Sequence, residues 1–161
     1  MTKKTKKNKE TLLVATDFTP FSEKALIFAG NLADKLEAQL LVLHVIHDPA
    51  EAPGFYVQKM KKKKFLQSME EAANEMMEVF LEKVKKANPG QTSIQEAIPL
   101  LVAGTPVSRV IEIAEKRQAT MIIVGSQGRT GLSHILIGSK AERLVRLSPI
   151  PVIVIKSSKK A

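Results

Sequence analysis

The stretch from Met121 to Glu142 constrains the fold of this chain more than any other. It begins with four apolar residues, Met121 to Val124, and continues as Gly125-Ser126-Gln127-Gly128. A short apolar run that is rich in β-branched residues and closed by glycine is typical of a strand buried on both faces. Strands of that kind belong to parallel sheets that helices cover on both sides. The stretch therefore predicts an α/β fold.

The glycines after this strand predict a phosphate-binding loop. Gly125 lets the backbone turn sharply or adopt a positive φ, and Gly128 removes a Cβ where an anion would approach backbone N–H groups. Farther on, Gly138 precedes Ser139-Lys140-Ala141-Glu142, which has the form of a capping box at a helix N-terminus. The unpaired N–H groups and positive dipole end of such a helix favour an anion. Two amide-rich turns are thus expected to close on one polyphosphate; the alternative is that the glycines only permit a tight loop and a helix cap.

Apolar segments alternate with amphipathic ones along the whole chain. Strands are expected at 11–16, 40–46, 93–102 and 152–155 in addition to the one at 121–124, and the segment 93–102 is expected near a sheet edge because polar residues interrupt it. Helices are expected to begin at Thr19-Pro20 and Thr105-Pro106, to extend through 66–84, and to follow Gly138. This βαβαβαβαβ order indicates a doubly wound sandwich.

The apolar face of each helix predicts its contribution to the core. The faces that follow from spacings of three and four residues are Ala25, Leu26, Ala29, Leu32, Ala33 and Leu36 in the first helix, Leu66, Met69, Ala73, Met76, Phe80 and Val84 in the long second helix, Val107, Val110, Ile111 and Ala114 in the third, and Ala141, Leu144 and Val145 in the last.

Composition and charge bound the class of protein. A chain of 161 residues that is 44% hydrophobic can bury a core by itself, and without cysteine it forms neither disulfides nor thiolate metal sites. Most of the formal charge of +9 lies in two lysine-rich tails, so we expect a disordered basic tail at 1–10, one domain at 11–156 and a basic tail at 157–161. The lysine run at 59–64 is expected to be a solvated helix end. No apolar segment is long enough for a secretion signal or a membrane span, which makes a cytoplasmic protein the expectation.

The spacing of the loop (glycine, two residues, glycine, nine residues, glycine, serine) resembles the ATP-binding signature of the universal stress protein family. The resemblance extends from Leu12 to Lys156 and includes Val14-Ala15-Thr16-Asp17-Phe18 and Pro151-Val152-Ile153-Val154-Ile155-Lys156. It implies an open five-stranded parallel sheet in the order 3-2-1-4-5, with helices on both faces, as in adenine nucleotide hydrolase-like folds. In that order the crevice beyond the carboxyl ends of the first and fourth strands is the topological switch point, where Asp17 and Gly125 lie.

The resemblance also implies which residues hold the nucleotide. They are Ala15, Thr16, Asp17, Val45, Val124, Gly125, Gly128, Arg129, Gly138 and Ser139. Val45 would contact the adenine and the glycines would contact the ribose and phosphates. Asp17 either binds Mg²⁺ that bridges to the phosphates, because Mg²⁺ usually combines a carboxylate with phosphate oxygens, or simply caps a turn. For the three histidines, structural or solvent-exposed roles are expected, since no pair has the spacing of metal ligands.

Three functions follow from these features. The first is an ATP-binding regulatory or stress-response protein with little or no turnover; the second is a slow Mg²⁺-dependent ATPase or phosphotransferase; the third is a basic protein that binds polyanions. The chain has no Walker A motif and no assigned catalytic residue, and its 4% aromatic content and lack of a base-stacking motif argue against specific binding of nucleic acid. The apolar strand Val152–Ile155 at the end of the implied order predicts a homodimer through that edge. The sequence does not distinguish ATP from AMP or a cyclic nucleotide.

Overall fold

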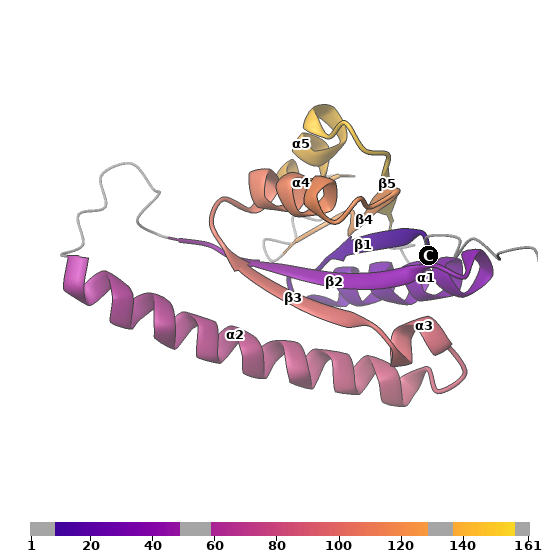
Figure 1. Cartoon of the computed structure of the whole chain (residues 1–161), viewed down its shortest axis with the longest axis horizontal. Helices are drawn as coiled ribbons and strands as arrows, with labels where there is room; N and C mark the ends of the chain where they lie inside the picture. The colour runs from indigo at the N-terminus through magenta and orange to yellow at the C-terminus, as the bar shows by residue number, and fades with distance from the viewer. Residues whose placement is uncertain (1–8, 49–58, 129–136, 157–161) are drawn as a thin grey trace, which may run out of the picture.

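Five parallel strands form the centre of the structure, a computed structural model that describes residues 9–48, 59–128 and 137–156. The strands are β1 (Thr11–Ala15), β2 (Gln39–Ile46), β3 (Ile98–Ala103), β4 (Met121–Gly125) and β5 (Val152–Ile155). All pairs are parallel and the order is β3-β2-β1-β4-β5, as the resemblance implies (Figure 1). The segment with the interrupted pattern, β3, is an edge strand, as predicted.

Helices cover both faces of this sheet. On one face lie α1 (Pro20–Leu36), α2 (Lys59–Ala87) and the short α3 (Thr92–Gln95); on the other lie α4 (Pro106–Lys116) and α5 (Ser139–Leu147) (Figure 1). Leu12 and Val14 of β1 pack on the α1 and α2 side, whereas Leu13 between them packs on the α4 side, and all three are fully buried. Because successive side chains point to opposite faces of a strand, a sheet covered on both sides needs the nearly continuous apolar runs seen in the sequence.

The start of α1 follows the sequence signal. Thr19 is the N-cap residue and its side chain accepts a hydrogen bond from the Ser22 N–H, while Pro20 occupies the first helical position. At the other end, Glu37 has a φ of 53° and its N–H donates to carbonyls of the last turn. α1 therefore begins directly after the carboxyl end of β1.

The predicted strand at 93–102 is wrong in its first half. Thr92–Gln95 forms α3, in which Ile94 is fully buried against α1, and the strand begins only at Ile98. Asp34 of α1 accepts a hydrogen bond from the Ser93 N–H at 2.7 Å, which holds α3 against α1. A contact between residues so far apart in sequence leaves no periodic signal, so a local pattern does not reveal it.

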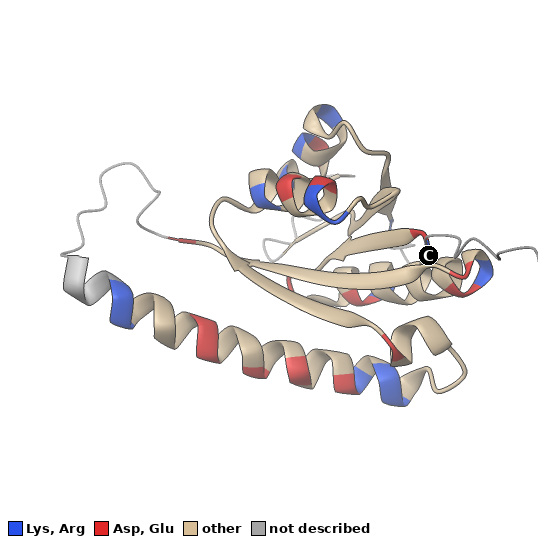
Figure 2. Ribbon diagram, viewed as in Figure 1, with Lys and Arg blue, Asp and Glu red and all other residues tan. Residues whose placement is uncertain are grey.

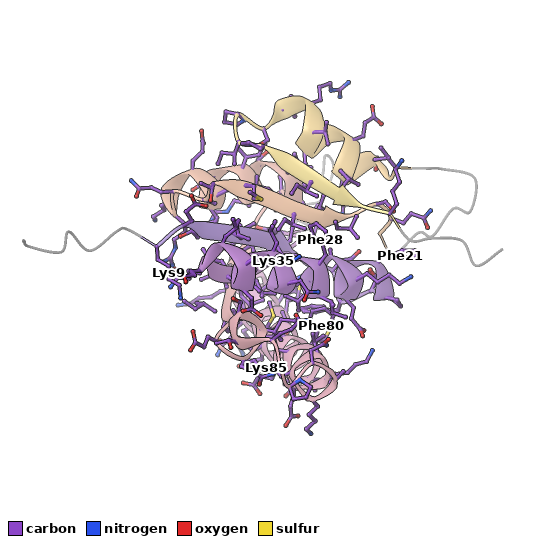
Figure 3. The ribbon with its side chains drawn as sticks, turned by 90° about the vertical axis from the view of Figure 1, so that its right-hand side faces the viewer. Lys9, Phe21, Phe28, Lys35, Phe80 and Lys85 are labelled. Carbon is purple, nitrogen blue, oxygen red and sulfur yellow. The ribbon has the colours of Figure 1, made fainter. Side chains whose placement is uncertain are left out.

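The predicted core faces of α2, α4 and α5 are right in part. In α2, Met77 is buried and Met76 is 46% exposed, and Leu66 and Met69 are only half-buried because the N-terminal half of α2 extends past the sheet (Figure 1). Phe80 lies between α2 and α1, as Figure 3 shows. The remaining deviations are Ile113, which is buried where Ile111 was predicted, Val145, which is 53% exposed, and Leu36 of α1, which was predicted on the core face and is 43% exposed.

Charge is concentrated on the helices rather than on the sheet. Figure 2 shows acidic residues along the middle of α2, with basic residues toward both of its ends. None of the helices within the described ranges is both long and apolar enough to cross a membrane. The tails at 1–8 and 157–161 and the connection 49–58 lie outside the described residues, so the domain limits at 11 and 156 stay predictions.

Candidate functional site

A cavity of about 510 Å³ opens beyond the carboxyl ends of β1, β2 and β4. Its position follows from the topology: the chain leaves β1 through α1 on one face of the sheet and leaves β4 toward α5 on the other face. The two connections diverge and leave a crevice at the switch point of the sheet.

The predicted nucleotide-binding residues converge on this cavity. Those that line it are Ala15, Thr16, Asp17, Val45, Val124, Gly125, Gly128, Gly138 and Ser139. The tenth, Arg129, lies outside the described residues, and so does His134. Ser126 and Gln127, the residues between the two glycines of the loop, also line the wall. Residues from three distant parts of the sequence are thus brought to one place, and their contacts with a nucleotide stay predictions.

Asp17 uses its two carboxylate oxygens differently. Oδ1 accepts hydrogen bonds from the Thr19 N–H at 3.2 Å and from the Thr19 hydroxyl, which closes the turn between β1 and α1. Oδ2 lies toward the glycine loop, because a Cβ added at Gly128 would be 3.2 Å from it. The turn-capping role predicted as one alternative for Asp17 is therefore present, and Oδ2 still faces the cavity.

The backbone between Thr16 and Phe18 is held in an uncommon conformation. Phe18 has a φ of 65°, which is unfavourable for a residue with a Cβ. Its N–H donates to the buried Thr16 hydroxyl oxygen at 3.1 Å, and that hydroxyl donates to the Ser22 hydroxyl at 3.0 Å. These bonds, together with the packing of the Phe18 ring, fix the turn that carries Asp17.

His44 supports the same turn from β2. Its Nδ1 donates to the Thr16 carbonyl oxygen at 2.8 Å, since a carbonyl only accepts. The imidazole also stacks on Phe18 with ring centroids 4.3 Å apart, and Phe18 contacts Phe80 of α2 edge-on at 5.6 Å. These contacts give His44 the structural role that the sequence predicts for it.

Gly125 is required for close packing and not for a positive φ. Of the glycines in the described ranges, Gly104 is the one with a positive φ, at 140°. A Cβ on Gly125 would lie 2.9 Å from the backbone carbon and oxygen of Phe21, so β4 and α1 approach closely only because this side chain is absent. Of the two alternatives predicted for Gly125, a sharp turn or a positive φ, the positive φ is not present.

The two glycine turns are bonded to one another. The Gly138 N–H donates to the Ser126 carbonyl oxygen at 2.6 Å, and a Cβ on Gly138 would lie 3.3 Å from that oxygen. Ser126 is itself buried, and its N–H donates to the Ile155 carbonyl oxygen at 2.9 Å. The loop after β4 and the start of α5 therefore form one continuous backbone surface.

The predicted capping box at α5 is wrong by one residue. Gly138 is the N-cap, because the Glu142 N–H donates to its carbonyl oxygen at 2.9 Å, and Ser139 is the first helical residue. The Ser139 side chain therefore does not cap the helix. The first N–H groups of a helix have no carbonyl one turn earlier to bond, and Ser139 and Lys140 of this first turn line the cavity.

Several residues that line the cavity were not predicted from the sequence. Lys140 adds a positive charge near the start of α5, and its position directly after the glycine-serine motif was the available signal. Met69, Ala73 and Met76 of α2 and Val107 of α4 form apolar parts of the wall. Only the packing of these helices against the sheet brings them there, so no local motif marks them.

The described residues do not form a metal site by themselves. In those ranges no three His, Asp or Glu side chains gather closely enough to hold an ion. Asp17 is the one carboxylate among the described residues that line the cavity. This donor set suits an Mg²⁺ ion that takes most of its ligands from phosphate oxygens and water.

Comparison with known proteins agrees with the fold and identifies the family. The sequence profile of the Universal stress protein family matches residues 9–156. The universal stress protein MJ0531 of Methanocaldococcus jannaschii is 31% identical over 156 residues, which cover 92% of this chain and 83% of that protein.

Solved structures show the same architecture. That of protein MJ0577, a universal stress protein of the same archaeon, superposes with a TM-score of 0.71 at 27% identity and covers 94% of this chain and 98% of its own. The universal stress protein from Archaeoglobus fulgidus in complex with dAMP has a similar fold, with a TM-score of 0.61 at 22% identity over 91% of this chain and 98% of its own. Since the family profile spans almost every described residue and both glycine turns, this chain belongs to the universal stress protein family.

Proposed function

We propose that this protein binds ATP as a regulatory ligand and turns it over slowly or not at all. The observation that carries the proposal is the convergence of the 125–128 turn, the N-terminus of α5 and the Asp17 carboxylate on one cavity. A related protein from Archaeoglobus fulgidus has been solved with the adenine nucleotide dAMP, which supports the same ligand class here.

The polyphosphate would bind at the end of the cavity formed by the two glycine turns. Backbone N–H groups at a helix N-terminus and the positive end of the helix dipole both favour an anion. Lys140 adds a full positive charge to this wall. Gly128 has no Cβ, so phosphate oxygens can approach the backbone on the side that faces Asp17.

The adenine would bind at the apolar end. Val45 of β2 and Val107 and Val110 of α4 line that part of the wall, and an apolar surface with few polar groups suits a planar base. The cavity thus combines an amide-rich end with an apolar end, which is the division that a nucleotide requires.

Magnesium would be held between the phosphates and Asp17. Mg²⁺ keeps several waters and is commonly bound by one or two carboxylates with substrate phosphates. When bound, the ion neutralises part of the phosphate charge. Asp17 Oδ1 is held by Thr19, so its position is fixed and Oδ2 is the ligand we assign.

Among the described residues of the wall, the side chains that could act as a base toward water are Asp17, His44 and His47, and we propose slow turnover because the first two have other roles. Efficient hydrolysis needs a residue that orients water in line with the γ-phosphate, besides a cation that stabilises the developing charge. Asp17 is the only carboxylate on the described part of the wall, and we assign it to the metal. His44 is held by Thr16 and Phe18, which restrains its ring. We therefore expect ATP to persist as a bound ligand.

The test uses two glycine-to-valine variants. Gly128→Val places a branched side chain in the path of the phosphate, and the first new atom would meet only the Asp17 carboxylate, at 3.2 Å. Gly90→Val is the matched control, because a Cβ there meets nothing within 4 Å. We expect Gly128→Val to weaken ATP binding at least about tenfold, which is roughly 1.4 kcal/mol. The control should bind as wild type.

Calorimetric titration with ATP, AMP and cyclic AMP would measure these affinities, and a single-turnover assay with labelled ATP would measure hydrolysis. Equal ATP affinity in folded Gly128→Val and Gly90→Val proteins would contradict the proposed site. Phosphate release within seconds would instead favour the slow ATPase or phosphotransferase, since binders of this kind should fall far below the ~1–100 s⁻¹ of kinases.

We also propose a homodimer through the outer edge of β5. The Ile122 N–H bonds the Pro151 carbonyl and the Ser126 N–H bonds the Ile155 carbonyl, so every second residue of β5 faces β4. The alternate residues, Val152 and Val154, then direct their backbone groups away from the sheet. Figure 3 shows Phe28 of α1 beside β5, and this ring is 41% exposed. An unpaired edge next to an exposed aromatic ring favours pairing with a second copy.

A further inference from the structure

Lys140 is the one lysine or arginine among the described residues that line the cavity. It is the second residue of α5, directly after Ser139, and it is exposed. Within the described part of the chain it forms no ion pair with an acidic side chain. A cation on a cavity wall that no carboxylate neutralises is available to an anionic ligand.

The position of Lys140 is unfavourable for α5 itself. The first turn of a helix carries the positive end of the helix dipole, which repels a cation. α1 has the opposite arrangement, with Glu23 in its first turn and Lys35 in its last. Glu142 lies in the same turn of α5 as Lys140, but residues two apart do not face each other on a helix. A residue that opposes its own helix is typical of a functional position, where a cost to local structure is accepted.

Opposite charges flank the phosphate end of the cavity. On one side, a Cβ on Gly128 would lie 3.2 Å from Oδ2 of Asp17. On the other side, a Cβ on Gly138 would lie 3.9 Å from the backbone nitrogen of Gly128, and Gly138 is the N-cap of α5. Asp17, Gly128 and the first turn of α5 therefore follow one another across the cavity. A phosphate chain on Gly128 would lie between the Asp17 carboxylate and Lys140.

Helical geometry directs Lys140 toward the mouth of this end. Leu144 lies one turn later on the same face of α5, where it is buried and lines the cavity. Side chains of a helix lean toward its N-terminus, so the Lys140 side chain extends past the first turn. Glu142 donates the first helical hydrogen bond, which leaves the backbone N–H groups of 139–141 for a ligand. The α5 terminus thus offers amide groups and, at the exposed mouth, an ammonium group.

We propose that Lys140 binds the outer phosphates of the nucleotide and gives the site a preference for a triphosphate over a monophosphate. The inference rests on the proposed ATP binding and names the side chain that distinguishes ATP from AMP. Backbone N–H groups at a helix N-terminus bind whichever phosphate reaches them. With the base at the apolar end, the phosphates that ATP has and AMP lacks are those farthest from the base, nearest the mouth. Lys140 therefore contacts ATP and not AMP.

Lys140 also offsets the negative charge of Asp17. Without Mg²⁺, the Asp17 carboxylate repels a polyphosphate, because like charges at close range disfavour one another. The Lys140 ammonium on the opposite side attracts the same phosphates. Loss of Lys140 should therefore make ATP binding more dependent on Mg²⁺, which is the opposite of the effect expected for loss of the charge of Asp17.

The test compares Lys140→Met with Lys24→Met. Methionine keeps a long, unbranched side chain and suits a helix, but it carries no charge. Lys24 is exposed and lies early in α1, which begins at the same edge of the sheet, but it does not line the cavity. Lys24→Met therefore removes the same charge from the surroundings of the site without removing a contact with the ligand.

Calorimetric titration of each full-length protein with ATP, ADP and AMP, with and without Mg²⁺, measures the affinities. We expect Lys140→Met to weaken ATP binding roughly fivefold, at the upper end for an exposed ion pair, and to change AMP binding less than about twofold. ADP should show an intermediate loss. The ratio of ATP affinity with Mg²⁺ to ATP affinity without it should rise in Lys140→Met. Lys24→Met should bind all three nucleotides as wild type.

Thermal unfolding without ligand separates a contact with ATP from a structural role. Lys140→Met removes a cation from the positive end of α5, so its melting temperature should equal or exceed that of wild type. A lower melting temperature, equal losses for ATP and AMP, or an equal loss of ATP affinity in Lys24→Met would each overturn the role of Lys140 and leave ATP binding in place. A wild-type protein that binds none of the three nucleotides would instead overturn the proposed function, and this inference with it.

Discussion

Replacing Gly125 with alanine tests the close approach of β4 and α1 directly. The new Cβ would lie 2.9 Å from the backbone carbon and oxygen of Phe21, and real Cβ atoms do not approach other atoms so closely. Those neighbours are backbone atoms within α1, so they cannot rotate away as a flexible side chain would. The helix or the strand must shift instead.

The magnitude follows from two opposing effects. Overpacking a well-packed interior costs typically about 1–3 kcal/mol, and contact with backbone suggests the upper part of that range. Replacing glycine by alanine also restricts the unfolded chain, which stabilises the fold by about 0.4–1 kcal/mol where the backbone permits it. The net loss for Gly125→Ala should be about 1–2 kcal/mol. For a chain of this size, the melting temperature should then fall by roughly 2–8 °C.

Thermal unfolding followed by circular dichroism is the assay, with Gly90→Ala as the control. A Cβ at Gly90 meets nothing within 4 Å, so only the effect on the unfolded chain remains and the melting temperature should stay level or rise slightly. If Gly125→Ala has the same melting temperature as Gly90→Ala, then the close contact with Phe21 does not constrain position 125 and the packing argument fails.

Two further changes probe the proposed ligand and the proposed dimer. Asp17→Asn keeps an oxygen that can accept hydrogen bonds from Thr19 but removes the negative charge, so ATP binding should lose most of its Mg²⁺ dependence while metal-free binding persists. Asp34→Asn is the control, because the Asp34 carboxylate bonds the Ser93 N–H of α3. An unchanged Mg²⁺ dependence in Asp17→Asn would refute the metal role. Val154→Pro removes a backbone N–H that faces away from β4, so light scattering should report loss of the dimer without loss of the fold. Ile153→Pro should in addition break the β4–β5 hydrogen bonds. A dimeric Val154→Pro protein would exclude the β5 edge as the dimer interface.

The sequence predicted those features that depend on residues close together in the chain. Each apolar run of β1, β2, β4 and β5 is short, continuous and bounded, so its strand could be recognised from composition alone. Thr19-Pro20 marked the start of α1 because capping and proline placement are local effects. The glycine motif marked the two turns of the cavity for the same reason.

Errors arose where a distant contact decides the local structure. Residues 93–97 were predicted as strand, yet Asp34 bonds the Ser93 N–H and Ile94 is buried against α1. The capping box after Gly138 was plausible in sequence, but the loop geometry makes Gly138 itself the cap. In α2, the periodicity of apolar residues fits two faces of the helix, and only the position of the sheet determines which one is buried.

The turn after β1 shows how such distant contacts reach the candidate site. Phe18 adopts a positive φ, a conformation that costs of order 1–3 kcal/mol unless the surroundings enforce it. The enforcement comes from His44 of β2 and Phe80 of α2, whose rings contact Phe18, and from the Thr16 hydroxyl, which accepts its N–H. Because Asp17 directly precedes Phe18, the position of its carboxylate depends on how α2 packs against the sheet. α2, which is far from β1 in the sequence, is therefore one of the elements that position the proposed magnesium ligand.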